Sequence, residues 1–364
     1  MHELTRKQAR RIAVTAQALT AERPGGIVET VDALSVVNID PTAAIAPSAD
    51  HILWSRIGWP YRPADLTRAV EVDRAIFEWA GFYRPMTDLA LYLPVMRAWP
   101  VYRDQRDWME ANARFADDVI AQLRASGPLR TGEIPDTSQV SWKSSGWTNE
   151  RNVTQMLEFL VLRGDVAIAG REGKERVWDV AERVYALSSP ELGDEDAARG
   201  RAERRLGSLG IARVKSVKQP VEPIDVGEIG EPARVEGVRG VWRVDPVVLR
   251  ASGSFAPRTA LLSPFDRLVF DRTRAQEIFD FEYIVEMYKP AGRRRWGYFA
   301  LPILYADRLV GKLDAAADRK AGLLRVHAVH EDEPFTAEMH DAVRAEIREL
   351  ASWLGLEVVG IPAE

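Results

Sequence analysis

Apolar residues recur at helical spacing in the first hundred positions of the chain. A capping box, Thr5 to Gln8, precedes an apolar stripe, which predicts an opening amphipathic helix. After a Pro-Gly-Gly break, a second short helix is predicted through Val31. Between Leu66 and Trp99 the pattern again favours helices, interrupted at Pro85 and Pro94.

The middle of the chain carries the clearest supersecondary pattern. Helices are predicted over 113–126 and, as a short one, over 130–136, and a third helix has an apolar stripe that stops at Gly164. Two strand-like runs around a polar tip then predict a hairpin over 166–180. Three helices followed by a hairpin is the order of a winged helix, although other α+β domains share this order.

Weaker signals follow along the chain. A helix over 196–210 and a hairpin over 233–245 leave open a third winged-helix unit. Alternation over 283–288 and 296–305, with a Pro-Ala-Gly turn between the two runs, predicts a long antiparallel hairpin. An apolar stripe over 336–354 predicts a terminal helix that ends at the next glycine.

The predicted fold class is therefore α+β, with tandem winged-helix units followed by a C-terminal antiparallel β domain and its terminal helix. The predicted parts are an N-terminal helical or winged-helix unit, a winged helix, the optional third winged-helix unit and the β-rich domain, over residues 1–110, 111–187, 188–258 and 259–364.

The composition excludes several classes of site. The chain has 364 residues, 46% hydrophobic and 28% charged, which fits a globular protein of two or three domains. It has no cysteine, so disulfides, thiolate zinc sites and iron–sulfur clusters are excluded. Its five histidines lack metal-ligand spacing, and His327 and His330 are interpreted as structural. No membrane span or signal peptide is found, and with a net charge of −5 any nucleic-acid binding needs a local basic patch.

Asn38 and Asp40 stand two positions apart, after an apolar pair and before a proline. In an extended backbone this spacing aims both side chains at one face. Alternatively, Asp40 followed by Pro41 is the usual arrangement of a helix N-cap with proline at the first helical position, and Asn38 then serves a turn. The residues alone favour this second interpretation.

Longer stretches carry a resemblance to a known family. The segment "LLSPFDRLVFDR", followed by "IFDFEYIVEMYKPAGRRRWGYFALPIL" and "LVGKLDAAADRKAGLLRV", resembles the C-terminal region of the winged-helix DNA glycosylases of the YcaQ/AlkZ type. The likeness continues in "SGWTNERNVTQMLEFLVLRGDVAIAGREGKERVWDVAERV" and in "NIDPTAAIAPSADHILWSRIG", and so covers most of the chain.

This resemblance implies a catalytic site. In that family a Gln-x-Gln or Gln-x-Asp motif supplies catalysis, and its counterpart here is Asn38-Ile39-Asp40. Asp40 would then orient and deprotonate a water and offset the positive charge that develops on the deoxyribose, while Asn38 would hold the water. A purine alkylated on a ring nitrogen is already a cationic leaving group, so neither a general acid nor a cofactor is implied.

Two positions depart from the family pattern. Asn38 replaces Gln, and its shorter side chain sets the amide back by about one bond length, enough to misplace a water. Where members of the Gln-x-Asp type carry a "WAHEA"-like stretch, this chain has "WAGFYRPM", which lacks the His-Glu pair. Either change would alter the lesion preference or abolish activity.

Basic residues supply candidate DNA contacts. Four of them flank the Pro-Ala-Gly turn of the predicted hairpin and precede Trp296: Lys289, Arg293, Arg294 and Arg295. A two-stranded finger would push these cations against phosphates or into the minor groove, unless its tip is simply solvated. Arg56 near the motif, and Lys143 and Arg151 near the predicted recognition helix, are further candidates.

Three functions therefore compete. The leading one is a monofunctional DNA glycosylase that removes bulky or crosslinked alkylated bases from duplex DNA, acting as a cytoplasmic, nucleoid-associated monomer. The second is a non-catalytic DNA-binding protein of the same fold, and the third is a winged-helix module that binds proteins. Salt dependence separates the third from the others, because phosphate contacts weaken steeply with salt.

Overall fold

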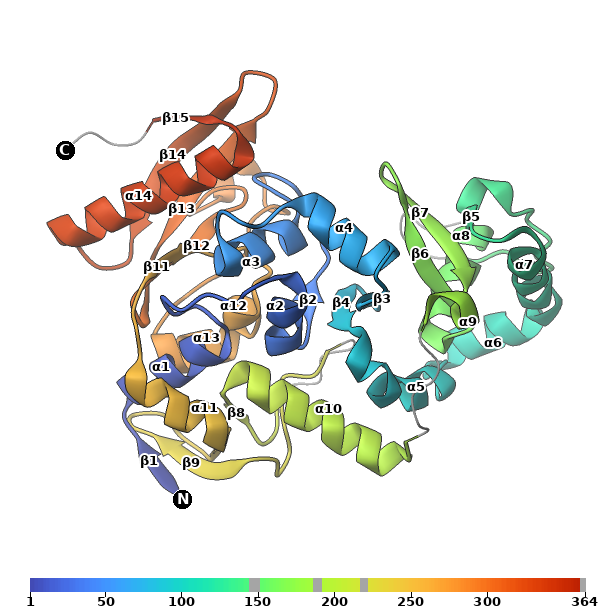
Figure 1. Cartoon of the computed structure of the whole chain (residues 1–364), viewed down its shortest axis with the longest axis horizontal. Helices are drawn as coiled ribbons and strands as arrows, with labels where there is room; N and C mark the ends of the chain where they lie inside the picture. Colours follow the sequence, from blue (N-terminus) through green and yellow to red (C-terminus); the bar gives the residue numbers. More distant parts are fainter. Residues whose placement is uncertain (144–150, 186–191, 217–221, 361–364) are drawn as a thin grey trace. The chain divides into compact units, whose positions relative to one another are not determined.

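The computed structural model describes residues 1–143, 151–185, 192–216 and 222–360. The chain divides into two compact units, Met1–Pro63 with Ala202–Glu364, and Ala64–Arg201 (Figure 1). The first unit thus joins both ends of the chain, which the four successive parts predicted from the sequence do not anticipate. The finer division, with a boundary at 187 outside the described residues, stays a prediction.

The first helix forms where its capping box predicts it. In α1 (Arg6–Ala16), the Thr5 hydroxyl accepts the backbone N–H of Gln8 at 3.2 Å, and the Gln8 side chain accepts the backbone N–H of Thr5 at 2.8 Å. The buried face of α1 packs against α11 (Pro246–Ala251) and α13 (Arg272–Phe279). These contacts hold the beginning of the chain against its C-terminal half.

A four-stranded sheet also combines distant segments of the first unit. Its strands are ordered β1 (His2–Leu4), β9 (Glu231–Val235), β10 (Trp242–Val244) and β8 (Ile211–Arg213). Strands β9 and β10 confirm the predicted hairpin, and α10 (Asp194–Leu209) confirms the predicted helix before it. Strand β1 pairs in parallel with β9, which the sequence pattern did not predict.

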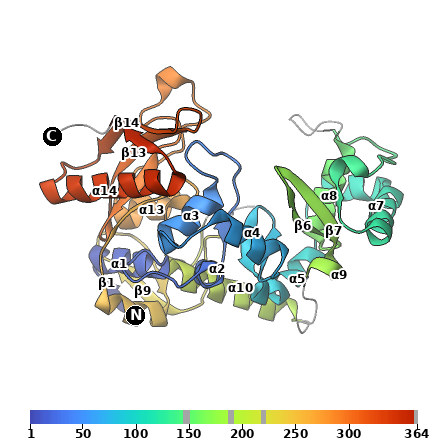
Figure 2. The ribbon, with the colours of Figure 1, turned by 45° about the horizontal axis from the view of Figure 1, so that its top comes forward.

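The second sheet of this unit is formed by the C-terminal part of the chain. It has the order β11 (Thr259–Leu261), β12 (Leu301–Tyr305), β13 (Arg308–Asp318), β14 (Leu323–Glu331) and β15 (Glu357–Val359). Helix α14 (Ala337–Leu354) lies along this sheet and contacts β11 and β15 (Figure 2). Its stripe is buried and Gly355 ends it in the left-handed conformation, as predicted.

The predicted hairpin of 283–288 with 296–305 is wrong. Residues 283–288 form no strand, and β12 pairs instead with β11 on one side and β13 on the other. Because both edges of β12 are occupied, the preceding segment has no edge left to join. Its alternation arises because Phe281 and Tyr283 are buried while Glu282 and Ile284 face solvent, in a chain that is not hydrogen-bonded as a strand.

In the second unit, one stretch predicted as helical is a β-hairpin. Strands β3 (Ile76–Trp79) and β4 (Phe82–Pro85) pair antiparallel through Ala80 and Gly81, whose φ angles of 53° and 81° suit a type I′ turn. Every residue of both strands is buried, so the sequence shows no alternation there. Pro94 lies inside α5 (Leu89–Arg97) and does not interrupt it.

The remainder of this unit follows the predicted order. Around the predicted segments the structure has α4 (Pro63–Glu71), α6 (Arg103–Ala111), α7 (Ala113–Ser126), β5 (Leu129–Arg130), α8 (Asn152–Arg163), β6 (Val166–Glu172), β7 (Glu175–Val180) and α9 (Ala181–Val184). The short helix predicted over 130–136 is a single 3-10 turn, Thr131–Glu133. Strands β5, β7 and β6 form a sheet in that order, and Gly164 ends α8 as predicted.

Within the described residues, no helix is long and apolar enough to cross a membrane. The same part of the chain contains no group of three or more histidine, aspartate or glutamate side chains that could hold a metal ion.

Candidate active site

The Asn-x-Asp motif lies in the first unit, in the segment between α2 (Ile27–Leu34) and α3 (Ser48–Ile57). Strand β2 (Val37–Asn38) ends at the first motif residue, and the backbone is irregular until α3 begins. No helix starts at Pro41, so the interpretation of Asp40 as a helix cap is wrong. One carboxylate oxygen of Asp40 instead accepts the backbone N–H of Thr42 at 2.8 Å, which closes a short turn.

Ser48 fixes the motif from the first turn of α3. Its fully buried hydroxyl accepts the backbone N–H of Asp40 at 2.7 Å and donates to the backbone oxygen of Asn38 at 2.8 Å. The side-chain oxygen of Asn38 also lies 3.2 Å from this hydroxyl. A hydroxyl has one proton, which it donates to one of the two Asn38 oxygens at a time, and the backbone oxygen is the nearer. The side-chain oxygen has two lone pairs and can therefore also accept from a water.

The loop between the motif and α3 is also tied to the second sheet. The backbone oxygen of Ala44 accepts the N–H of Ala317 on β13 at 2.9 Å, and the backbone oxygen of Ile45 accepts a guanidinium N–H of Arg319 at 3.0 Å. With Ser48 at its end, this segment, residues 38–48, is held at both sides. We call it the motif loop. Asn38 and Asp40 are half-buried on it, so they are fixed by the backbone and still reach solvent.

The basic residues of 289–295 lie on a compact loop of residues 282–298, which we call the basic loop. The buried carboxylate of Glu286 accepts the backbone N–H groups of Arg295 and Trp296 and the ammonium of Lys289, each at 2.7 Å. Burial acts to raise the pKa of Glu286, but these three hydrogen bonds outweigh it and the pKa is lowered. The loop is therefore held together around a buried carboxylate and is not the two-stranded finger that the sequence predicted.

Its cations differ in what they contact. Lys289 is used inside the loop by Glu286, and Arg295 pairs with Glu282 at 3.0 Å with both side chains about two-thirds exposed. Arg294 donates to the backbone oxygen of Lys289 at 2.9 Å and lies over the ring of Tyr298. Arg293 is exposed. The arginine side chains thus lie on the outer surface of the basic loop, with Arg293 and Arg295 exposed and Arg294 half-buried.

A groove of about 420 Å³ lies between the two loops. Its walls are Ala44 of the motif loop and Arg294, Arg295 and Tyr298 of the basic loop. Its floor is formed by side chains of β13 and β14, which include Asp314, His327 and His330. The motif loop therefore contributes Ala44 to the lining of a groove that also includes the guanidinium groups of Arg294 and Arg295 and the carboxyl group of Asp314.

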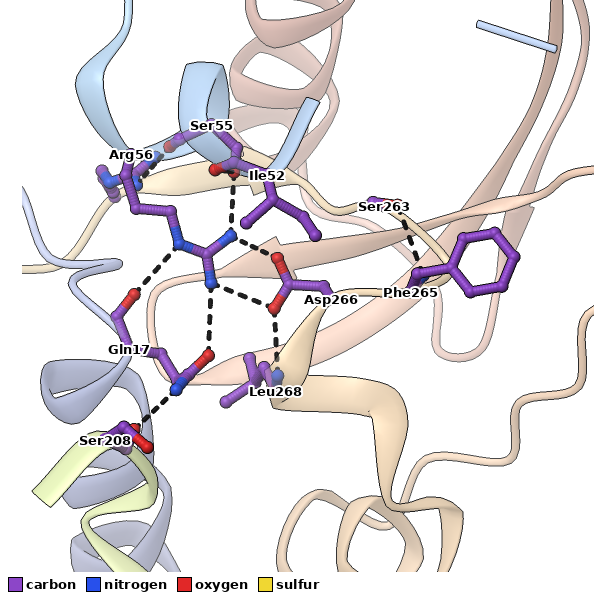
Figure 3. Close-up of polar contacts among 10 residues, drawn as sticks. Gln17, Ile52, Ser55, Arg56, Ser208, Ser263, Phe265, Asp266 and Leu268 are labelled. Carbon is purple, nitrogen blue, oxygen red and sulfur yellow. Dashed lines mark hydrogen bonds and ion pairs between the residues drawn. The ribbon is translucent and has the colours of Figure 1, made fainter. Parts of the chain in front are cut away.

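Arg56 does not belong to this surface, so its interpretation as a DNA contact is corrected. The side chain is fully buried and makes a bidentate pair with Asp266, whose second contact is 3.0 Å long (Figure 3). Its Nε donates to the backbone oxygen of Gln17 at 3.1 Å, and the Gln17 amide continues the network to the backbone of Ser208 at 2.5 Å (Figure 3). A guanidinium held in this way cannot reach a phosphate.

Lys143 and Arg151 lie in the second unit, and both are exposed. Arg151 directly precedes α8, and the residues between the two, 144–150, lie outside the described part of the chain. A role for either in DNA binding stays a prediction.

Sequence reasoning missed the residues that act through tertiary contacts. A serine after a proline at a helix start reads as a capping residue, and only its contacts show that Ser48 bonds to the motif. Asp266, the partner of Arg56, lies 210 positions away along the chain. His327 is exposed and lines the groove, whereas the sequence placed it among structural residues.

Two comparisons with known proteins identify the family of this chain. A family model described as DNA glycosylase AlkZ-like matches residues 31–353, which include the motif loop, the basic loop and the groove. Among solved structures, the DNA glycosylase AlkZ of Streptomyces sahachiroi is similar in fold, with a TM-score of 0.65 and 16% identity over 99% of this chain and 100% of that chain. The chain therefore belongs to the AlkZ-like DNA glycosylase family.

Proposed function

We propose that the protein is a monofunctional DNA glycosylase that hydrolyses the N-glycosidic bond of bulky or crosslinked alkylated bases in duplex DNA. The observation that carries the proposal is the motif loop, in which Ser48 holds Asn38 and Asp40 together and from which Ala44 lines a groove shared with Arg294 and Arg295. We propose further that it acts as a cytoplasmic, nucleoid-associated monomer.

The chemistry assigned to the motif is the following. The free oxygen of Asp40 accepts a proton from a water that Asn38 orients through its amide oxygen. The water oxygen forms a bond to the sugar C1′ while the bond from C1′ to the base nitrogen breaks, and the electron pair of that bond leaves with the base. The carboxylate also stabilises the positive charge that builds on the sugar more than it stabilises the ground state. A base that is already cationic needs no proton from the protein.

The proposed preference for bulky lesions rests on the form of the site. A base crosslinked to the other strand cannot be rotated fully into a closed pocket. The groove beside the motif loop has an exposed rim, with the Arg295 side chain 66% and the Tyr298 residue 44% exposed. A site of this kind admits a lesion without enclosing it.

Winged-helix docking is part of the proposal. The order α7, β5, 3-10 turn, α8, β6, β7 in the second unit is that of a winged helix, with α8 as the helix that would enter the major groove. Lys143 and Arg151 would then contact phosphates near the start of α8. The alternative function, non-catalytic DNA binding, is favoured by Asn38 in place of the glutamine of the family motif.

The decisive experiment separates these two functions. Duplex carrying an N7-alkylguanine is incubated with the wild type and with Asp40→Asn, and strand cleavage is measured after alkali. We expect base release by the wild type and a loss of about 100-fold or more in the variant, with DNA affinity nearly unchanged. Wild-type protein that binds this duplex but releases no base would establish the non-catalytic alternative.

Asn38→Gln provides a matched test of the first motif position. It restores the side chain of the family motif, and we expect equal or higher activity. A folded but inactive Asn38→Gln protein would show that the site is built around the shorter amide.

A further inference from the structure

A second pocket also takes part of its lining from the motif loop. Its volume is about 360 Å³, and its lining includes Ala46, Pro47, Trp59, Arg62 and Arg319. Pockets for small molecules measure about 300–1,000 Å³, so this one has room for a ligand the size of one nucleotide and not for a duplex.

Two tryptophans contribute flat aromatic surface to this pocket. Trp59, in the turn after α3, is 49% exposed, although tryptophan is highly buried on average. Trp353, in the last turn of α14, is half-buried and stacks on the buried ring of Trp54, with the ring centroids 5.1 Å apart and the planes at 17°. Aromatic side chains bind nucleobases by stacking, because every base has a flat face.

Two guanidinium groups add positive charge. The Arg62 side chain donates to the backbone oxygen of Tyr61 at 2.9 Å, and that of Arg319 donates to the backbone oxygen of Ile45 at 3.0 Å. Both arginines are exposed, and within the described part of the chain neither forms a salt bridge. The backbone therefore positions these cations while their charge stays available to a phosphate.

Asp50 supplies the pocket with a hydrogen-bond acceptor. One of its carboxylate oxygens accepts the hydroxyl group of Tyr61 at 2.6 Å, and the other meets no donor among the described residues. A carboxylate opposes a phosphate but accepts a hydrogen bond from the amino group of a base. A bound nucleotide would thus place its base toward Asp50 and its phosphate toward the arginines.

Trp59 also lines another hollow, of about 670 Å³, in which the charges differ. The charged residues there are Arg23, Glu346 and Glu349. Two carboxylates and one guanidinium disfavour a phosphate, whereas the smaller pocket has two guanidinium groups and one carboxylate. A nucleotide that stacks on Trp59 is therefore favoured in the smaller pocket.

We propose that this smaller pocket holds one unpaired nucleotide of the DNA, with its base stacked on Trp59 and its phosphate at Arg62 and Arg319. The proposal rests on the proposed function in that DNA is the ligand. A base inside a duplex is covered on both faces and cannot reach the indole, so the pocket selects DNA in which a base has left the stack. Damaged bases leave it at the lowest cost. The pocket thus distinguishes damaged from intact duplex, which the cations of the basic loop do not.

The test compares three duplexes that differ at one position: a fully paired duplex, one with an unpaired cytosine, and one with an abasic nucleotide in place of that cytosine. Fluorescence anisotropy measures the affinity of the full-length protein for each. We expect the unpaired cytosine to be bound about tenfold more tightly than either of the others, because one stacked base is worth about 5- to 150-fold. The abasic duplex has the same interruption without the base.

Variants of Trp59 and Arg62 test the two contacts separately. Trp59→Ala should remove most of the preference and leave the affinity for the paired duplex unchanged, whereas Trp59→Phe keeps an aromatic face and should retain most of it. Arg62→Gln should reduce the additional salt dependence of binding to the unpaired duplex, because it removes a phosphate contact. Tyr102→Ala, at an aromatic residue that is 58% exposed in the second unit, is the matched control and should behave as wild type.

A fluorescent base reports the stacking directly. With 2-aminopurine as the unpaired base, its fluorescence should fall when wild-type protein binds and should fall less with Trp59→Ala. Thermal unfolding of each variant shows that only folded protein is compared.

The outcomes are distinguishable from those of the proposed function. Equal affinity of the wild type for the three duplexes, or a Trp59→Ala protein that keeps the preference, would overturn the pocket assignment. Binding of free deoxycytidine monophosphate without a preference among the duplexes would also overturn it, since the ligand would then be a soluble nucleotide. If base release still depends on Asp40 in either case, the glycosylase proposal stands alone. If the preference depends on Trp59 but no base is released, the pocket assignment stands and the glycosylase proposal fails.

Discussion

Arg56 and Arg295 were both predicted from the sequence to contact DNA, but the structure places them in different surroundings. Arg56 pairs with Asp266, and neither side chain has any exposed surface. Arg295 pairs with Glu282, and these side chains are 66% and 62% exposed. Both are pairs of a guanidinium and a carboxylate, but the buried pair is bidentate and the exposed pair has a single contact.

The difference in burial determines what each pair contributes. A buried guanidinium and carboxylate lose their hydration and depend on each other, so removal of one leaves an uncompensated charge in the core. An exposed pair is screened by water and salt and contributes little to stability. Arg295 can therefore exchange Glu282 for a phosphate at small cost, whereas Arg56 cannot leave Asp266.

The largest expected effect is at the buried pair. Arg56→Met should lower the free energy of unfolding by about 3–5 kcal/mol, because it leaves Asp266 charged and buried without its partner. Urea unfolding measures this loss. The double variant Arg56→Met with Asp266→Leu should recover part of it, since both charges are then absent. A stable Arg56→Met protein with a flatter salt dependence of DNA binding would return Arg56 to the DNA interface.

The buried pair also lies near a group that makes the stability of the protein depend on pH, namely His51. It lies on α3, fully buried beside the same pair, and burial lowers its pKa from 6.5 to about 4, a shift that Asp266 opposes and Arg56 reinforces. The folded protein keeps the imidazole neutral, so protonation favours the unfolded chain below about pH 6.5. Stability is thus fully present above that pH and falls by up to about 3 kcal/mol toward pH 4.

Urea unfolding at a series of pH values between about 7.5 and about 4.5 measures this loss. His51→Leu should flatten the part of the curve above about pH 5, where few carboxylates titrate. An unchanged curve in His51→Leu would assign the acid sensitivity to other groups.

The arginines of the basic loop should show the reverse of the Arg56 result. Replacement of Arg293, Arg294 and Arg295 by alanine should leave the unfolding free energy nearly unchanged, because exposed pairs contribute little. Binding to damaged and undamaged duplex should weaken alike, with the slope of the salt plot reduced by about 0.9 for each phosphate that no longer meets a guanidinium. Fluorescence anisotropy against salt concentration measures both quantities. Wild-type affinity and slope in the triple variant would leave Lys143 and Arg151 as the remaining candidates.

The same comparison shows what the sequence could predict. Helices α8 and α14 were predicted well, because an apolar stripe and a terminal glycine are local signals. The β3–β4 hairpin was missed because complete burial removes the alternation that marks a strand. The pattern at 283–288 was misleading because burial alternates there without strand pairing.

In the candidate site, too, only the features with a local signal could be predicted. The resemblance placed the motif at Asn38 and Asp40, but the partner of Arg56 is 210 positions distant and the stacking of Trp353 on Trp54 joins helices from opposite ends of the chain. Neither leaves a local signal. A basic residue in a sequence thus indicates charge, and only the fold decides whether that charge faces DNA or a buried carboxylate.

The last prediction concerns Ser48, which is buried as Arg56 is but acts on the half-exposed motif. Ser48→Ala removes the acceptor of the Asp40 N–H and the contact with the Asn38 amide. Because small displacements of a water and its base are costly to rate, we expect base release to slow by about tenfold or more, with DNA affinity unchanged. Single-turnover excision and equilibrium binding of the same duplex separate the two quantities.

Ser55→Ala is the matched control on the same helix. Ser55 is also buried, and its hydroxyl donates to the backbone oxygen of Ile52 and accepts from Arg56, at 2.8 Å and 2.9 Å. Both variants remove one buried hydroxyl from α3 and should lose about 1–3 kcal/mol of stability. Only Ser48→Ala should also lose rate in the folded protein. Equal excision rates in the two variants would mean that Ser48 holds the fold without positioning the motif, because a purely structural hydroxyl acts on stability alone.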